Sequence, residues 1–376
     1  MESTETIVAI AERLQKRLVF VLSLGDKELF HSNVLAWFLE HCCGEHCGSA
    51  DFAPVAALFG ITDGTVRNVW REEANFDLLV QYYRNAEPDK PRFVVIENKF
   101  KSMPRGEQLD EYRGKVRDGK VSVEKLHDDI ETPAGKKQVK VRPSLDNTSF
   151  FLLAPQKSIG CTFPELPEGW ASVSYESLLA AFPAAVQGDA FASGFVSEYK
   201  QMMGDLLQLA DHAVTAASDE NAPCLASRDV LSVLEEIRAH DIYQKLFFSA
   251  MRGTLGIQRT GWKCDVFYRH GGCLKWMYVR DGVTYGIELQ NNDSKYLDFH
   301  VFAESDKKLP AAADLKPRLL GWLCAGFSGQ DVKSKKDGTL NQYKEKHKYV
   351  HAFVPDATSI AALRSKITAV MTAIEK

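Results

Sequence analysis

Residues 75–112 decide the fold and read NFDLLVQYYRNAEPDKPRFVVIENKFKSMPRGEQLDEY. The first segment is apolar at nearly every position after Asp77 and is rich in aromatic residues, as expected of a buried strand. A second segment, residues 93–100, is apolar until it reaches the polar letters ENK. Turn-forming Asn, Pro and Asp residues at 85–91 separate the two segments, so the pattern predicts a β-hairpin.

The polar residues at the end of the second strand are unusual in such an apolar setting. Side chains alternate along a strand, so Glu97 and Lys99 project from one face while Asn98 points away. Burying a carboxylate and an ammonium is costly unless they are paired or bind a charged group. Asp77 on the neighbouring strand adds a second acid, and the set predicts a divalent-cation site facing a phosphate. The structural alternative is a plain buried ion pair of Lys99 with Glu97 or Asp77.

Two helices precede this hairpin. Residues 3–22 are predicted to form one amphipathic helix, whose apolar stripe comprises Ile7, Ile10, Leu14, Leu18 and Val21. A second helix carries ELFHSNVLAWFLEH at 28–41, with Glu28 and Ser32 one turn apart on the same face. Glu28 either complements the helix dipole as a first-turn acid or belongs to the active site.

A further helix is predicted directly after the hairpin, over residues 105–116. Gln108 and Tyr112 are one turn apart on it and share a face. The segment 133–143 that follows is predicted to be a flexible basic loop without acids, containing Lys136, Lys137, Lys140 and Arg142. We expect this loop to emerge close to the acids and to contact nucleic-acid phosphates; the alternative is a solvated insertion.

One cluster, HCCGEHCG at residues 41–48, gathers metal-ligand residue types. Structural zinc sites use four ligands, commonly two pairs brought together by the fold. His41 to Cys47 form a single cluster with no second Cys/His pair at a suitable distance. A helix-ending loop with buried or idle thiols is therefore favoured over a zinc site.

The length and composition of the chain limit the class of protein to which it can belong. A chain of 376 residues is long enough for two ordinary domains, and 45% hydrophobic and 26% charged residues are typical of a globular protein. The formal net charge of -4 excludes a general polycation, so nucleic-acid binding has to use local basic patches. No apolar run reaches the roughly 18 residues of a membrane span. Eight scattered cysteines favour reduced thiols and a cytoplasmic location.

The second half contains a separate set of elements. A polar linker is expected at 213–223, followed by a helix over 227–251 and an antiparallel meander of four aromatic-rich strands. The domain prediction is therefore 1–215 for an α/β domain with a mixed sheet and 224–376 for an α+β domain. The second domain is expected to position substrate or a partner, or to mediate homo-oligomer formation.

Asp77 followed by Glu97-Asn98-Lys99 resembles the motif of the PD-(D/E)XK nuclease superfamily, an acid and then (D/E)-X-K. The fuller pattern is similar to a bacterial stand-alone branch, in which a helix like ELFHSNVLAWFL precedes IENK and a Q-x-x-x-Y helix follows. The resemblance covers roughly residues 20–180, and it departs from the family in having Asn-Phe, without proline, before the first acid. It implies a restriction-endonuclease-like core, with a mixed central sheet flanked by helices.

The resemblance also implies roles for the site residues. Asp77, Glu97 and the backbone carbonyl of Asn98 would hold Mg²⁺, with Mn²⁺ as a substitute. Lys99 would orient or deprotonate the attacking water or hold the transition-state charge. The resemblance also makes Glu28 a third acid of the catalytic set. Gln108 and Tyr112 would support the lysine or contact the phosphate backbone of the nucleic acid.

The expected function is therefore metal-dependent hydrolysis of phosphodiester bonds, in DNA more than in RNA, by an endo- or exonuclease. The resemblance suggests bacterial antiviral defence or repair as its setting. The alternative is a catalytically silent nuclease-like module that binds DNA or protein. An intact Asp77, Glu97 and Lys99 set argues against that alternative, because binding alone does not require all three.

Overall fold

The computed structural model describes residues 2–23, 27–41, 52–100, 106–121, 127–132, 135–140, 142–157, 166–186, 188–267, 273–291, 297–306, 309–328, 332–333, 340–343, 346–355 and 357–376. The chain forms two compact units, one of residues 12–208 and one of residues 1–11 with 209–376. The unit boundaries fall inside helices α1 (Glu2–Lys16) and α8 (Ala190–Ser218). Because α8 continues to Ser218, part of the expected linker is helical; the domain limits 1–215 and 224–376 stay a prediction.

The unit of residues 12–208 is built on a five-stranded sheet in the order β1-β2-β3-β6-β7. Strands β1, β2 and β3 are antiparallel, whereas β3, β6 and β7 are parallel, which confirms the predicted mixed sheet. The strand bounds are β1 Thr65–Arg71, β2 Leu78–Arg84, β3 Glu87–Asn98, β6 Thr148–Ala154 and β7 Trp170–Ser174.

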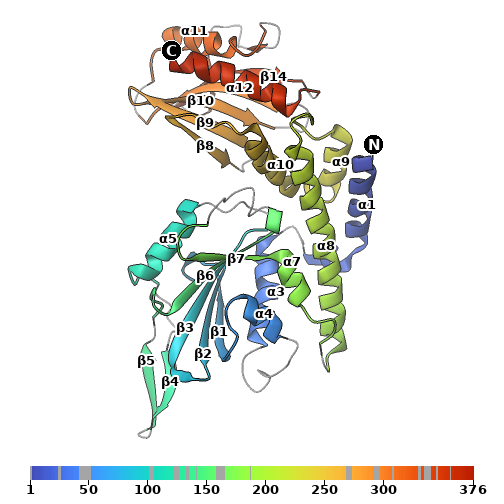
Figure 1. The fold of residues 1–376 in the computed structure, drawn as a ribbon, viewed down its shortest axis with the longest axis vertical. Coiled ribbons are helices and arrows are strands. Elements are labelled where there is room, and N and C mark those ends of the chain that lie inside the picture. The colour runs from blue at the N-terminus through green and yellow to red at the C-terminus, as the bar shows by residue number, and fades with distance from the viewer. Residues whose placement is uncertain are drawn as a thin grey trace. The chain divides into compact units, whose positions relative to one another are not determined.

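Helices cover both faces of this sheet (Figure 1). Helix α5 (Gly106–Arg117) lies on one face, where its Leu109 and Tyr112 join a buried cluster with Val95. On the other face lie α3 (Glu28–Glu40), α4 (Ala53–Leu58) and α7 (Tyr175–Ala181). Because side chains alternate along β3, its odd-numbered residues face α5 and its even-numbered residues face α3. The end of β3 is thus in contact with both helical layers.

The central hairpin forms as predicted, but its turn is shorter than expected. Strand β3 already begins at Glu87, which pairs with Arg84, and the register shifts between Tyr83 and Arg84. Strand β6 pairs with β3 only from Phe93 onward, so the proline-containing part of β3 has a neighbour on one side. Proline is tolerated in such an edge position because no ladder hydrogen bond is lost there.

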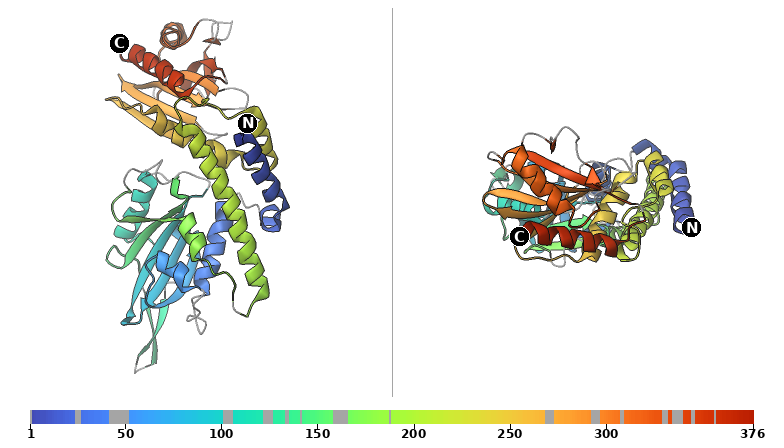
Figure 2. Two further views of the ribbon diagram at one scale, coloured as in Figure 1. Left: turned by 45° about the vertical axis from the view of Figure 1, so that its right-hand side comes forward. Right: turned by 90° about the horizontal axis from the view of Figure 1, so that it is seen from above.

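The basic segment forms a hairpin, so the prediction of a flexible loop is wrong for its described residues. Strands β4 (His127–Thr132) and β5 (Gly135–Lys140) pair with each other as a separate antiparallel ribbon (Figure 2). The chain then enters β6 beside Phe93, whose amide N donates to Asn147 O at 2.8 Å. Phe93 precedes Glu97 by about 13 Å along the strand. The ribbon therefore joins the sheet at the end opposite to the acids.

The N-terminal segment is two helices instead of one. Helix α1 ends at Lys16 and α2 (Leu18–Ser23) follows, with Arg17 between them. The guanidinium of Arg17 donates to Asp205 Oδ2 at 2.7 Å. The predicted stripe therefore stops at the break: Leu18 is 64% exposed, whereas Ile7, Ile10 and Leu14 are buried.

The second unit contains an antiparallel sheet in the order β12-β14-β11-β10-β9-β8, with β13 also paired to β14. The four predicted strands are present, but the predicted helix 227–251 is two helices, because Arg238 adopts a left-handed φ of 57° between them. The bounds are α9 Arg228–Glu236, α10 His240–Leu255, β8 Trp262–Phe267, β9 Cys273–Arg280, β10 Val283–Gln290, β11 Leu297–Glu304, α11 Ala312–Leu323, β12 Val332–Lys333, β13 Asn341–Tyr343, β14 His347–Val354 and α12 Ile360–Glu375.

A close backbone approach at the start of β1 gives a test of the sheet. Gly64 has a φ of 131°, and a Cβ there would lie 2.0 Å from the carbonyl O of Tyr83. We expect Gly64→Ala to lower the free energy of unfolding by about 2–4 kcal/mol in urea denaturation. Gly119→Ala is the control: its φ is 63° with nothing within 4 Å, so only about 1 kcal/mol should be lost. Equal losses would contradict the close approach of Gly64 to the end of β2.

Candidate active site

The first acid, Asp77, closely follows a strained turn. A 3-10 turn at Glu73–Asn75 precedes it, in which Ala74 and Asn75 adopt left-handed φ values of 55° and 67°. Such values cost a non-glycine residue about 1–3 kcal/mol and cluster at functional sites. The Asp77 carboxylate accepts a hydrogen bond at Oδ2 from Asn98 N, at 2.7 Å. This bond ties the start of β2 to the end of β3.

The second acid, Glu97, is held by two partners on the α5 side of the sheet. Its side chain is 1% exposed, and Oε1 lies 2.6 Å from Lys99 Nζ. Gln108 Nε2 donates to the same oxygen at 3.0 Å and to Tyr112 OH at 2.8 Å. The predicted pairing of Gln108 with Tyr112 on one helix face therefore connects α5 to the acid.

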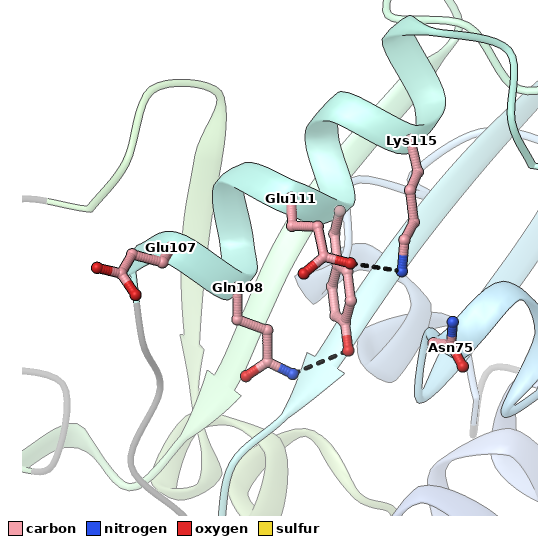
Figure 3. Close-up of a pocket in the computed structure, with 6 residues that line it drawn as sticks. Asn75, Glu107, Gln108, Glu111 and Lys115 are labelled. Carbon is pink, nitrogen blue, oxygen red and sulfur yellow. Dashed lines mark hydrogen bonds and ion pairs between the residues drawn. The ribbon is translucent and has the colours of Figure 1, made fainter. Parts of the chain in front are cut away.

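A polar pocket opens beside this pair (Figure 3). Its volume is about 350 Å³, and its lining residues are Asn75, Glu107, Gln108, Glu111, Tyr112 and Lys115. Gln108, Glu111 and Lys115 lie along one side of α5, and Asn75 faces them from the strained turn. Lys115 Nζ is 3.0 Å from Glu111 Oε1, which orients the ammonium toward the pocket wall. The pocket brings solvent and ligands to within reach of Gln108 and Tyr112.

Burial and crowding of charge perturb the acid–base behaviour of the site. Burial raises the pKa of Asp77 above its usual value and raises the pKa of Glu97 to about 8. For Lys99, burial lowers the pKa, but attraction by Glu97, Glu28 and Asp77 outweighs it, and the net shift is upward. Burial, together with repulsion from Asp77, thus favours the protonated form of Glu97 below about pH 8, and a bound cation would favour its carboxylate.

The residues present fit a divalent cation of the Mg²⁺ type. No donor among the described residues bonds to the buried Glu97 Oε2, and the Asp77 carboxylate lies within hydrogen-bond reach of Glu97, so two acceptors face each other as they would around a cation. Within the described ranges, no three His, Cys, Asp or Glu side chains gather closely enough to form a cage by themselves. Two carboxylates, the carbonyl of Asn98 and several waters are the ligands that Mg²⁺ accepts. The donor set therefore suits Mg²⁺ better than a thiolate-preferring ion.

The structure brings most of the predicted site residues together. Asp77, Glu97, Lys99, Gln108 and Tyr112 form one connected group. The carboxylate of Glu28 lies close enough to raise the pKa of Asp77 and of Lys99. This places the first turn of α3 beside the group.

The other predicted binding residues lie apart. Lys136, Lys137 and Lys140 are on β5, and Arg142 follows it toward the far end of β6, so the register does not bring them to the acids. The cluster from His41 to Cys47 lies outside the described residues except for its first member, whose Nδ1 is 2.7 Å from Trp37 O. Phosphate binding and zinc binding by these two segments stay predictions.

Sequence reasoning missed three side chains behind the motif. The amide of Asn98 is 0% exposed and bonds to Ser32 and Tyr175, which are also buried. The spacing of Glu28 and Ser32 was a signal that they share a helix face, but it gave no partner for the serine. Nothing local in sequence connects Tyr175 with residue 98.

The mixed five-stranded sheet flanked by helices is a restriction-endonuclease-like core. A sequence model described as the PD-(D/E)XK nuclease superfamily matches residues 18–188, a segment that contains every member of the connected group. Neither the curated proteins nor the solved structures gave a match to the chain. Among the described helices, none is both long and apolar enough to span a membrane.

The segment 18–188 therefore belongs to the PD-(D/E)XK nuclease superfamily. Within it, Asp77, Glu97 and Lys99 occupy the acid, (D/E) and K positions of the motif. Members of this superfamily act on nucleic acids and typically use divalent metals, so a nucleic-acid substrate and a divalent metal follow at the level of the family.

The raised pKa of Glu97 predicts a pH-dependent metal affinity. Below about pH 8 the cation has to displace a proton, so the association constant should rise up to tenfold per pH unit and level off above that pH. The same shift means that the metal-free protein loses stability as pH rises from the unfolded-state pKa of about 4.3 through about 8. Calorimetry at pH 7 in buffers of different ionisation enthalpy should count about one proton released per Mg²⁺. Binding without proton release would contradict this assignment.

Proposed function

We propose that the chain is a Mg²⁺-dependent nuclease that hydrolyses phosphodiester bonds in DNA. The observation that carries the proposal is the end of β3, where Glu97 is paired with Lys99 yet keeps a buried oxygen without a partner among the described residues. A purely structural ion pair would have both carboxylate oxygens satisfied, because an unpaired buried oxygen is costly. The open oxygen beside Asp77 instead suits a cation-binding function.

Each residue has a distinct task in this proposal. Asp77, Glu97 and the Asn98 carbonyl would hold the metal, which when bound supplies charge neutralisation at the phosphate and a more acidic water. Lys99, kept protonated by the acids around it, would orient that water or stabilise charge on the attacked phosphate. Gln108 donates to Glu97 Oε1 and so keeps the carboxylate from rotating.

Substitution of the two charged residues of the motif tests the function. We expect Glu97→Gln and Lys99→Ala each to reduce cleavage of supercoiled plasmid in Mg²⁺ by at least about 100-fold. Both should remain folded, because without Lys99 the buried Glu97 takes up a proton instead of remaining charged. Wild-type cleavage should require Mg²⁺ or Mn²⁺ and stop in EDTA, and Ca²⁺ should support little of it.

The same strand offers matched controls. Glu87 and Lys90 form an exposed ion pair at the other end of β3, with Nζ and Oε1 2.9 Å apart. Glu87→Gln and Lys90→Ala should leave cleavage unchanged. If Glu97→Gln cleaves normally, or wild-type protein is fully active in EDTA, the nuclease assignment is wrong; cleavage of RNA but not of DNA would correct the substrate alone.

The β4–β5 ribbon is proposed as a phosphate contact distant from the cut. Changing Lys136, Lys137 and Lys140 together to Ala should weaken DNA binding and flatten its salt dependence by up to about 0.9 log–log units per lost contact. Turnover at saturating DNA should change little. An unchanged salt slope in a fluorescence titration would show that the ribbon is a solvated insertion.

The unit outside the matched segment is proposed to position substrate or a partner, including a second copy of the chain. The support is that residues 209–376 carry a sheet of their own and lie beyond the family match. A role in antiviral defence or repair rests on the resemblance to bacterial stand-alone nucleases. Light scattering of the purified protein with and without DNA would test the oligomeric part of this proposal.

A further inference from the structure

The side chain of Asn98, between the acid and the lysine of the motif, has a hydrogen-bond network of its own. The residue is 0% exposed and points to the α3 side of the sheet, away from Glu97 and Lys99. Its Nδ2 donates to Glu28 O at 3.1 Å and to Ser32 Oγ at 2.9 Å, and its Oδ1 accepts from Tyr175 OH at 2.6 Å. Both ends of the amide are therefore occupied by buried partners.

The partners belong to the element that carries the third acid. Ser32 Oγ donates to Glu28 O at 3.1 Å, so the amide and the hydroxyl converge on one carbonyl in the first turn of α3. The residue before this turn, Lys27, gives it no side-chain cap. The Asn98 amide is thus a direct polar link between the catalytic strand and the helix start that places the Glu28 carboxylate.

Tyr175 holds the carbonyl end of the amide. It is 0% exposed at the start of α7, and its hydroxyl can only donate to an acceptor when it is protonated. The Glu28 carbonyl can only accept, so it requires the Nδ2 group on the α3 side, and the Tyr175 hydroxyl donates to the remaining Oδ1.

We propose that Asn98 is a positioning residue: its amide, held at its other end by Tyr175, clamps the first turn of α3 to the catalytic strand and thereby sets the Glu28 carboxylate at the metal site. This inference rests on the proposed metal site but not on cleavage of DNA. A side chain that only filled space at this position would need no polar partners, and an apolar residue of similar size would serve. Three hydrogen bonds to one buried amide instead specify a geometry.

A double-mutant cycle on Mn²⁺ binding, measured by calorimetry without nucleic acid, tests the proposal. Asn98→Ala should weaken Mn²⁺ binding by about tenfold or more, as loss of supporting residues around metal ligands does. In a Glu28→Gln background the same substitution should weaken binding less than about twofold, because the carboxylate that it positions is already gone. Ser32→Ala, which removes one partner and leaves the amide in place, should show the same dependence on Glu28 with a smaller loss.

Tyr199→Phe is the matched control. This buried tyrosine also bonds to a residue of α3, with its OH 3.1 Å from His31 Nδ1, but the bond does not involve Asn98. Its removal should leave Mn²⁺ affinity unchanged, whereas Tyr175→Phe should lower affinity only when Glu28 is present. Circular dichroism of each variant reports whether the fold is kept, and Ser32→Ala decides if Asn98→Ala does not fold.

The outcomes separate this inference from the proposed function. Equal losses of affinity with and without Glu28 would mean that Asn98 does not act through the helix, and the inference would be wrong while the metal site stands. If the losses of Mn²⁺ affinity depend on Glu28 but the protein cleaves no nucleic acid, the inference is supported and the nuclease proposal is contradicted. A wild-type protein that binds no Mn²⁺ would overturn both.

Discussion

The buried contact between Lys99 and Glu97 is the interaction on which the site depends. A carboxylate that is 1% exposed is stable as an anion only with compensating charge, and the ammonium 2.6 Å away provides part of it. Asp77 and Glu28 add further negative charge to the same place, and a single lysine cannot balance three acids. Burial, and then repulsion from Asp77, raises the pKa of Glu97 to about 8, and one of its oxygens receives no hydrogen bond from the described residues. Acids buried in this way form the kind of arrangement that a cation would neutralise.

Strand geometry then divides three consecutive residues between two helical layers. Glu97 and Lys99 meet α5 through Gln108, while Asn98 meets α3 and α7 through Ser32 and Tyr175. Neither layer can shift along the end of β3 without breaking its own hydrogen bonds to that strand, and both are tied to adjacent residues of it. The backbone of Asn98 contributes as well, because its N–H fixes Asp77. One short segment therefore sets the relative positions of groups supplied by four different elements.

The parts of this arrangement that the sequence predicted are those controlled by local periodicity. Alternation along a strand placed Glu97 and Lys99 on one face, and helical spacing paired Gln108 with Tyr112. The polar network behind Asn98 was not predictable, because its partners lie 66 and 77 residues away and depend on how the layers pack. Two local errors have physical causes as well. Prolines next to the turn suggested a loop, but they occupy an edge position of β3, and the polar basic segment found a pairing partner in β4.

The wide separation of these contacts along the chain has a consequence for biosynthesis. Closing long loops is entropically costly, so contacts of high sequence separation form late relative to local hairpins and helices. The hairpin that holds Asp77 and Glu97 is local, whereas the bond from Tyr175 to Asn98 closes 77 residues and requires β6, β7 and the start of α7. A nascent or proteolytically shortened chain that ends before α7 contains the whole acid–lysine motif yet lacks the group that holds the carbonyl end of its middle residue's amide. In this order of assembly, the hydrogen-bond network behind the motif is complete only once β6, β7 and the start of α7 are present.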